Sequence, residues 1–81
     1  PMPNPVLRTA LVNFELPAAT NVTVRVFDMS GKLLQSMNMG KVAQGQNQFM
    51  LNTEQFQTGL YIMAMTTEFG TVTRKFAVGN K

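Results

Sequence analysis

The 81-residue sequence contains no cysteine and no histidine. The chain therefore has neither disulfides nor thiolate or imidazole metal ligands, and it lacks the commonest general base and partner of catalytic nucleophiles. Its four acids, Glu15, Asp28, Glu54 and Glu68, are scattered, each beside a predicted turn or on a predicted solvent face. The sequence predicts no catalytic, cofactor-binding or metal-binding residue, and so a protein that is not an enzyme.

Charge is also sparse. Charged residues make up 14% of the chain and its net charge is +3, whereas a nucleic-acid-binding domain usually carries a dense basic stripe. We therefore expect no nucleic-acid partner. No run of about twenty apolar residues is present, so no membrane-spanning helix is predicted. A signal peptide and an initiator methionine are missing too, and we expect the chain to be an excised part of a longer protein.

Apolar residues are plentiful, at 44% of the chain, which is enough for the core of one small domain. Strands are predicted at 9–16, 21–27, 33–39 and 46–52 and in a terminal hairpin, 58–81. In 9–16, 21–27 and the second strand of the hairpin, apolar residues alternate with polar ones with the period of two that is typical of β-strands. Short strands about ten residues apart predict an all-β fold, an immunoglobulin-like β-sandwich of six to seven mostly antiparallel strands. The predicted inner faces comprise Val12, Phe14, Val22, Val24, Val26, Leu33, Phe49, Leu51, Tyr61, Met63, Phe76 and Val78.

Turn residues separate these segments. Asp28-Met29-Ser30-Gly31 predicts a tight hairpin turn rather than a calcium loop, because further oxygen ligands are lacking. In the terminal hairpin, Glu68-Phe69-Gly70 places a glycine where the chain reverses. The segment 53–58 is the one place where a helical turn is predicted, with Thr53 as its cap and Phe56 as its anchor.

The terminal hairpin combines apolar and basic residues. Both faces of its first strand, from Leu60, are apolar, which predicts a strand buried between two layers. The second strand has one apolar face, and Arg74, Lys75 and Lys81 lie in or after it. These basic residues have two interpretations: protection of an outer strand against edge-to-edge aggregation, or a surface for a partner.

Several stretches resemble, in order, the type A C-terminal sorting domains of the type IX secretion system of Bacteroidota. The matching stretches cover nearly the whole chain and are Pro3-Asn4-Pro5, the strand ending Glu15-Leu16-Pro17, Val22 to Phe27, the turn Asp28 to Leu33, Gly59-Leu60-Tyr61, and Thr71 to Val78. Two departures are visible: Met2 stands where the family often has an aromatic residue, and residues 79–81 extend slightly past the last strand.

The resemblance implies a secretion signal at the end of a larger protein. Residues 1–8 would be a linker and lead-in segment from an N-terminal cargo domain, and residues 9–81 the sorting domain. The implied partners are the outer-membrane translocation machinery and a sortase-like cysteine peptidase that cleaves such domains when cargo is anchored to lipopolysaccharide. The cargo would cross the periplasm and then be secreted or held at the cell surface. Cleavage and a homodimer formed by strand exchange stay open.

A hypothesis for recognition follows from the terminal hairpin. Its outer strand would pair with a receptor strand through backbone hydrogen bonds, and its basic groups would steer an acidic partner. The candidate recognition residues are Gly59, Tyr61, Arg74, Lys75, Phe76, Val78 and Lys81. The alternative is a fibronectin-like or carbohydrate-binding module that stays on the secreted protein. That alternative requires a patch of exposed aromatic residues, for which Phe27 and Phe69 are the candidates.

Overall fold

The computed structural model describes residues 9–79, and the lead-in segment 1–8 and Lys81 lie outside the described residues. Six strands follow one another in this range: β1 (Thr9–Leu16), β2 (Thr20–Asp28), β3 (Leu33–Val42), β4 (Gly45–Asn52), β5 (Gly59–Thr67) and β6 (Gly70–Val78). Residues 9–79 include no helix with the length and hydropathy needed to cross a membrane.

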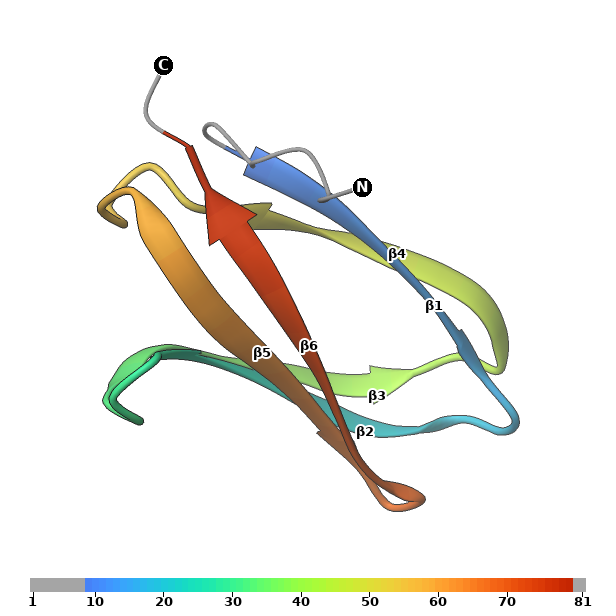
Figure 1. The fold of residues 1–81 in the computed structure, drawn as a ribbon. Helices are drawn as coiled ribbons and strands as arrows, with labels where there is room; N and C mark the ends of the chain where they lie inside the picture. The colour runs from blue at the N-terminus through green and yellow to red at the C-terminus, as the bar shows by residue number, and fades with distance from the viewer. Residues whose placement is uncertain (1–8, 80–81) are drawn as a thin grey trace.

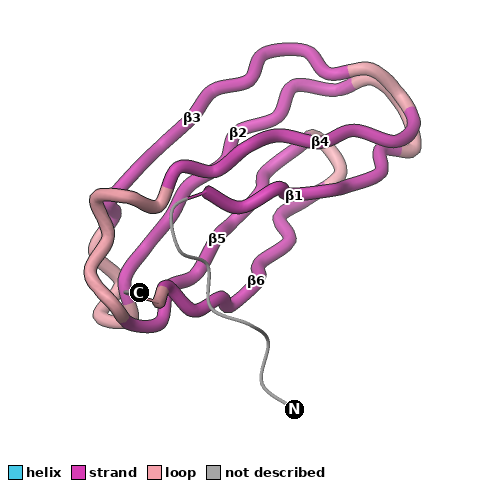
Figure 2. Tube along the Cα trace, turned by 90° about the horizontal axis from the view of Figure 1, so that it is seen from above, coloured by secondary structure: helices cyan, strands magenta, loops and turns pink. Residues whose placement is uncertain are grey.

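The strands form two antiparallel sheets that face each other (Figure 1). The small sheet contains β1 and β4, and the large sheet has the order β3-β2-β5-β6. Seen from above, β1 and β4 lie over the middle of the large sheet, with β3 on one side and β6 on the other (Figure 2). The predicted all-β, immunoglobulin-like sandwich is confirmed.

The core lies between the sheets and follows directly from the alternation in the sequence. In β2, Val22, Val24 and Val26 are each at most 1% exposed, because every second side chain of a strand points to the same face. From the small sheet, Leu51 is 1% exposed. Phe14 of β1 contacts Phe49 of β4 edge to face, with ring centroids 5.9 Å apart. Removal of this apolar surface from water is the main force that holds the two sheets together.

The predicted turn at Asp28 is confirmed. One carboxylate oxygen, Asp28 Oδ1, accepts hydrogen bonds from the backbone N–H of Ser30 (2.9 Å) and of Lys32 (3.0 Å) and from the Ser30 hydroxyl (2.6 Å). Gly31 has a φ of 93°, which a residue with a Cβ rarely adopts. The aspartate therefore organises the turn by satisfying backbone donors that would otherwise need water.

The segment 53–58 differs from its prediction. Phe56 N–H donates to the Thr53 carbonyl at 3.0 Å, which makes a single turn without a helix. Thr53 does not cap this turn with its side chain; instead Asn52 Oδ1 accepts from Glu54 N–H at 2.9 Å. The asparagine one residue earlier reaches the free backbone donor, so the threonine hydroxyl is turned into the interior. Phe56 does pack against the core, as predicted.

Two predictions about the faces of the sheets are wrong. Leu33, expected inside, is 48% exposed, because a β-bulge between Val26 and Phe27 shifts the register and places Leu33 opposite Phe27. The second face of β5 is not covered by another layer either: Leu60 is 44% exposed, and Ile62 and Ala64 are half-buried. These residues lie on the outer face of the large sheet, where no described element packs over them.

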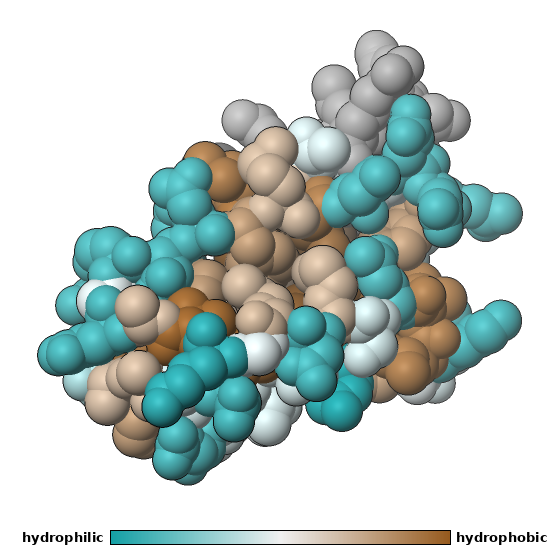
Figure 3. Space-filling model, turned by 180° about the vertical axis from the view of Figure 1, so that it is seen from behind, coloured by the Kyte–Doolittle hydropathy of each residue, from teal (hydrophilic) through white to brown (hydrophobic). Residues whose placement is uncertain are grey.

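Apolar side chains also reach the surface in other parts of residues 9–79. The back of the molecule shows apolar side chains across the middle of this face, between hydrophilic side chains on either side (Figure 3). The exposed large apolar residues within 9–79 are Leu11, Met29, Leu33, Leu34, Met50, Leu60, Phe69 and Val72. Val72 belongs to β6, at the margin of the large sheet.

Candidate recognition surface at the β5–β6 hairpin

The β5–β6 hairpin brings four of the predicted recognition residues together as cross-strand partners. Gly59 pairs with Val78, and Tyr61 pairs with Phe76. Tyr61 and Val78 are buried in the core, at 7% and 3% exposure, and Phe76 packs against it. These side chains are therefore held inside the domain, where they help to keep the hairpin in place.

The Tyr61 ring is the centre of an aromatic cluster. It stacks on Phe56 with centroids 5.0 Å apart and lies 5.8 Å from the Phe76 ring. Its hydroxyl donates a hydrogen bond to the Gln57 carbonyl. A buried tyrosine generally needs such a partner for its polar end, so the loop before β5 is fixed to the strand by both packing and hydrogen bonding.

Gly59 begins β5 with a φ of 159°, a backbone conformation that side-chain-bearing residues rarely adopt. A Cβ on Gly59 would find Tyr61 Cε1 at 4.0 Å, which is an ordinary contact. Backbone conformation rather than space therefore favours glycine at this position.

Arg74 and Lys75 are both exposed but point to opposite faces of β6. Arg74 pairs with Met63, whose side chain faces the core, whereas Lys75 pairs with Ile62 on the outer face. The sequence placed them together as one basic group, and the pleat of the strand separates them. Lys81, the third member of that group, lies outside the described residues.

The strand that carries them is a sheet edge. Within residues 9–79, β6 pairs only with β5, so half of its backbone donors and acceptors face away from the sheet. Such an edge can accept a strand from another chain. The prediction that the last strand lies outermost in its sheet agrees with this position.

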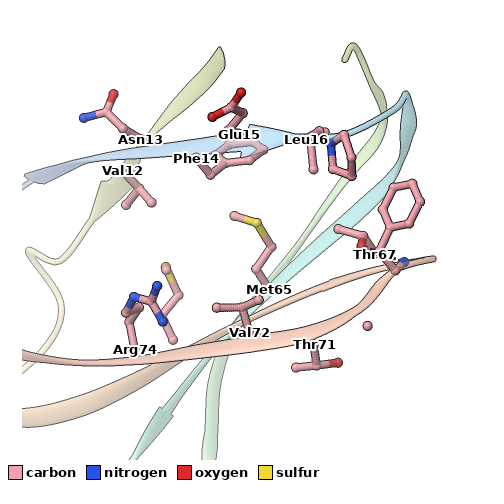
Figure 4. A pocket seen from close by; sticks show the side chains of 14 residues that line it. Val12, Asn13, Phe14, Glu15, Leu16, Met65, Thr67, Thr71, Val72 and Arg74 are labelled. Carbon is pink, nitrogen blue, oxygen red and sulfur yellow. Dashed lines mark hydrogen bonds between the residues drawn. The ribbon is translucent and has the colours of Figure 1, made fainter. Parts of the chain in front are cut away.

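A groove of about 450 Å³ lies between β1 and the β5–β6 hairpin, and this feature was not anticipated from the sequence. Val12 and Phe14 of β1 point into it from one side, and Val72 and Arg74 of β6 from the other (Figure 4). Met65 contributes to its floor. The only sequence signal was the alternation of β6, which assigns Arg74 to the same face as Val72 and Phe76.

The polar chemistry of the surface is modest. Asp28 has a pKa below its ordinary value of 3.8, because it accepts the Ser30 side-chain hydrogen bond and the Lys32 backbone hydrogen bond. In the part of the chain that the structure describes, no group of three or more His, Cys, Asp or Glu residues is placed to hold a metal ion.

The two aromatic residues that were candidates for a binding module do not form one patch. Phe27 lies opposite Ile62 on the outer face, whereas the exposed Phe69 lies in the β5–β6 turn.

Nearly the whole chain matches one known protein family. Residues 2–79 match the family model of the secretion system C-terminal sorting domain. The chain belongs to this family. Its membership indicates a C-terminal sorting signal of type IX secretion, a signal rather than a catalytic domain. A sorting domain of this kind implies interaction with the secretion machinery and a protein that passes through the periplasm to the outside or to the cell surface.

Neither a curated protein nor a solved structure matches this sorting domain.

Proposed function

We propose that this domain directs a cargo protein, joined to its N-terminal side, across the outer membrane by presenting a folded surface to the type IX translocation machinery. The observation that carries the proposal is the family match over residues 2–79. The described residues support it in one further respect: they make a compact sandwich whose final strand is an edge with basic side chains on both faces.

The proposed recognition surface is the β6 edge. A receptor strand would bond to the free backbone groups of β6, and Arg74 and Lys75 would attract acidic groups on the receptor. Gly59, Tyr61, Phe76 and Val78 act indirectly, because they fix β6 against β5 and the core. Lys81 would extend the basic surface beyond the strand.

After translocation, in this proposal, a sortase-like cysteine peptidase removes the domain by cleaving near the lead-in segment 1–8, and the cargo is anchored to lipopolysaccharide. Cleavage can be followed with a reporter that carries one epitope before residue 1 and another after Lys81. If the domain is removed, the surface form retains the first epitope and lacks the second. A surface form with both epitopes would show that the domain stays attached.

The function is tested by fusing residues 1–81 to a periplasmic reporter in a bacterium that has type IX secretion. We expect the reporter to reach the surface or the medium, and to stay in the periplasm when the translocation machinery is deleted. A reporter without residues 1–81 is the control. Equal export with and without these residues would refute the proposal. Normal export by a series of Arg74, Lys75 and C-terminal truncation variants would instead place the receptor surface elsewhere on the domain.

A further inference from the structure

The groove between β1 and β6 exists because the two sheets differ in width. β1 has a neighbour, β4, on one side only within residues 9–79, and its other edge opens onto the groove. Below this edge, β6 extends the large sheet past the small one (Figure 2). The small sheet therefore lacks the strand that would cover β6.

We propose that this groove receives an extended strand of the secretion partner, which pairs with the free edge of β1 and becomes the third strand of the small sheet. This inference rests on the proposed function and names the site and the ligand chemistry for it. Strand addition supplies affinity through backbone hydrogen bonds and specificity through alternate side chains. A strand added to β1 would also lie directly over β6, so the groove and the β6 edge belong to one contact region.

The lining of the groove fits the inner face of a strand. Val12, Phe14 and Met65 give it apolar walls and floor. Val72 is 53% exposed although it points to the core-facing side of the large sheet. Neighbouring strands lie about 4.8 Å apart and facing sheets about 10 Å apart. One strand beside β1 therefore has the position needed to cover Val72.

The positive charge of Arg74 in the groove indicates what kind of strand would bind there. Arg74 points into the groove, where its guanidinium donates a hydrogen bond to the Thr73 carbonyl at 3.0 Å, and no carboxylate of residues 9–79 forms a salt bridge with it. Glu15 lies at the groove margin but points away from it and accepts from Gln46 at 3.2 Å. We expect the incoming strand to alternate, with apolar side chains over Val72 and a carboxylate near Arg74.

The same charge argues against a second copy of this chain as the occupant. The chain has a net charge of +3, and β6 presents the two basic residues Arg74 and Lys75. A second β6 seated in the groove would bring like charges together, which costs free energy at an interface. An acidic, alternating strand from a different protein avoids this repulsion.

Two matched pairs of variants test the inference in the reporter fusion. Arg74→Glu and Lys75→Glu make the same change in net charge on neighbouring residues, but Arg74 lies in the groove and Lys75 lies on the opposite face. The long-range electrostatic attraction of an acidic partner is thus weakened equally in both variants. Val72→Lys and Thr73→Lys form the second pair, with Val72 in the groove and Thr73 opposite Ala64 on the outer face.

We expect export to fall about tenfold more for Arg74→Glu than for Lys75→Glu, because a groove charge contacts the partner directly whereas the other charge acts only through steering. Val72→Lys should likewise lose more export than Thr73→Lys. All four positions are exposed, so circular dichroism and thermal unfolding of the purified variants should show folded domains. If Val72→Lys is unfolded, the export of Arg74→Glu compared with Lys75→Glu alone decides whether the groove contacts the partner.

The outcomes separate this inference from the proposed function. Failure of the unaltered fusion to be exported overturns both. Export of the unaltered fusion with equal effects of Arg74→Glu and Lys75→Glu overturns the groove and leaves the sorting function in place. Sedimentation equilibrium of the purified domain tests the other possible occupant, a second copy of the chain. A dimer that Arg74→Glu dissociates would show that the groove holds a second copy, and would overturn the assignment to a partner strand.

Discussion

The hydroxyl of Tyr61 donates a hydrogen bond to the backbone carbonyl of Gln57, four residues earlier. The loop before β5 is thereby fixed to the buried strand at the point where Phe56 also stacks on the Tyr61 ring. One side chain thus connects the core, the preceding loop and the hairpin proposed for recognition. Substitutions of Tyr61 can therefore measure separately what the packed ring and the hydroxyl hydrogen bond contribute to stability.

Tyr61→Ala should destabilise the domain severely and thereby impair sorting. Loss of a buried aromatic ring costs about 3–5 kcal/mol, against an expected free energy of unfolding of roughly 4–12 kcal/mol for a chain of this length. Tyr61→Phe keeps the ring and should cost about 1 kcal/mol. Urea unfolding followed by circular dichroism measures both. Equal losses for the two variants would mean that the hydroxyl, and not the ring, dominates.

Gly59→Ala should lower the free energy of unfolding by about 1 kcal/mol, because the new side chain disfavours the backbone conformation that Gly59 adopts. Thr58 provides a control beside Gly59, because it is exposed and no residue other than glycine has a positive φ in the described part of the chain. Thr58→Ala should be close to neutral. The prediction is wrong if both alanine variants unfold at the same urea concentration.

Thr53→Val should stabilise the domain by about 1 kcal/mol. Thr53 is 1% exposed, and its hydroxyl has no hydrogen-bond partner among residues 9–79; a buried hydroxyl in that state costs free energy. Valine has the same shape without the polar atom.

Thr20 is the control for Thr53, because it is equally buried but bonded. Its hydroxyl donates to the Asn21 carbonyl and accepts from Glu68 N–H, both at 3.2 Å. Thr20→Val should therefore destabilise the domain by about 1–3 kcal/mol, since the backbone donor of Glu68 loses its partner. Thermal unfolding of both variants gives the sign directly, and shifts in the same direction would contradict the argument.

The turn at Asp28 should make stability depend on pH in acid. The pKa of Asp28 is lower in the folded domain than its ordinary value of 3.8, because of the hydrogen bonds from Ser30 and Lys32. The ionised carboxylate thus contributes stability above pH 3.8, and this contribution disappears as the pH falls through the lower pKa of the folded state. Asp28→Asn keeps a side-chain acceptor but does not ionise.

The melting temperatures of wild type and Asp28→Asn, measured from pH 7 to pH 2, test this dependence. Wild type should be the more stable protein at neutral pH, and the difference should shrink once the pH is below 3.8. A difference that stays constant over the whole range would show that the charge of Asp28 plays no part.

Much of the local structure could be predicted from the sequence. Alternation located all six strands, and the turns closed by Gly31 and Gly70 have the predicted positive φ values of 93° and 127°. These features depend on neighbouring residues and on the period of the strand, which the sequence displays directly. The bulge that exposes Leu33 could not be predicted, because it depends on the pairing of β2 with β3.

The residues of the candidate site could be predicted from the sequence, but the shape of the site could not. The sequence by itself determined an alternating apolar chain with a basic last strand, and the motifs of a sorting domain. Only the tertiary structure decided that β1 and β6, far apart in the sequence, line one groove, and that Arg74 faces this groove while Lys75 faces solvent. The physical reason is that strand periodicity fixes which side chains share a face, whereas long-range pairing and the unequal widths of the sheets fix which faces are covered.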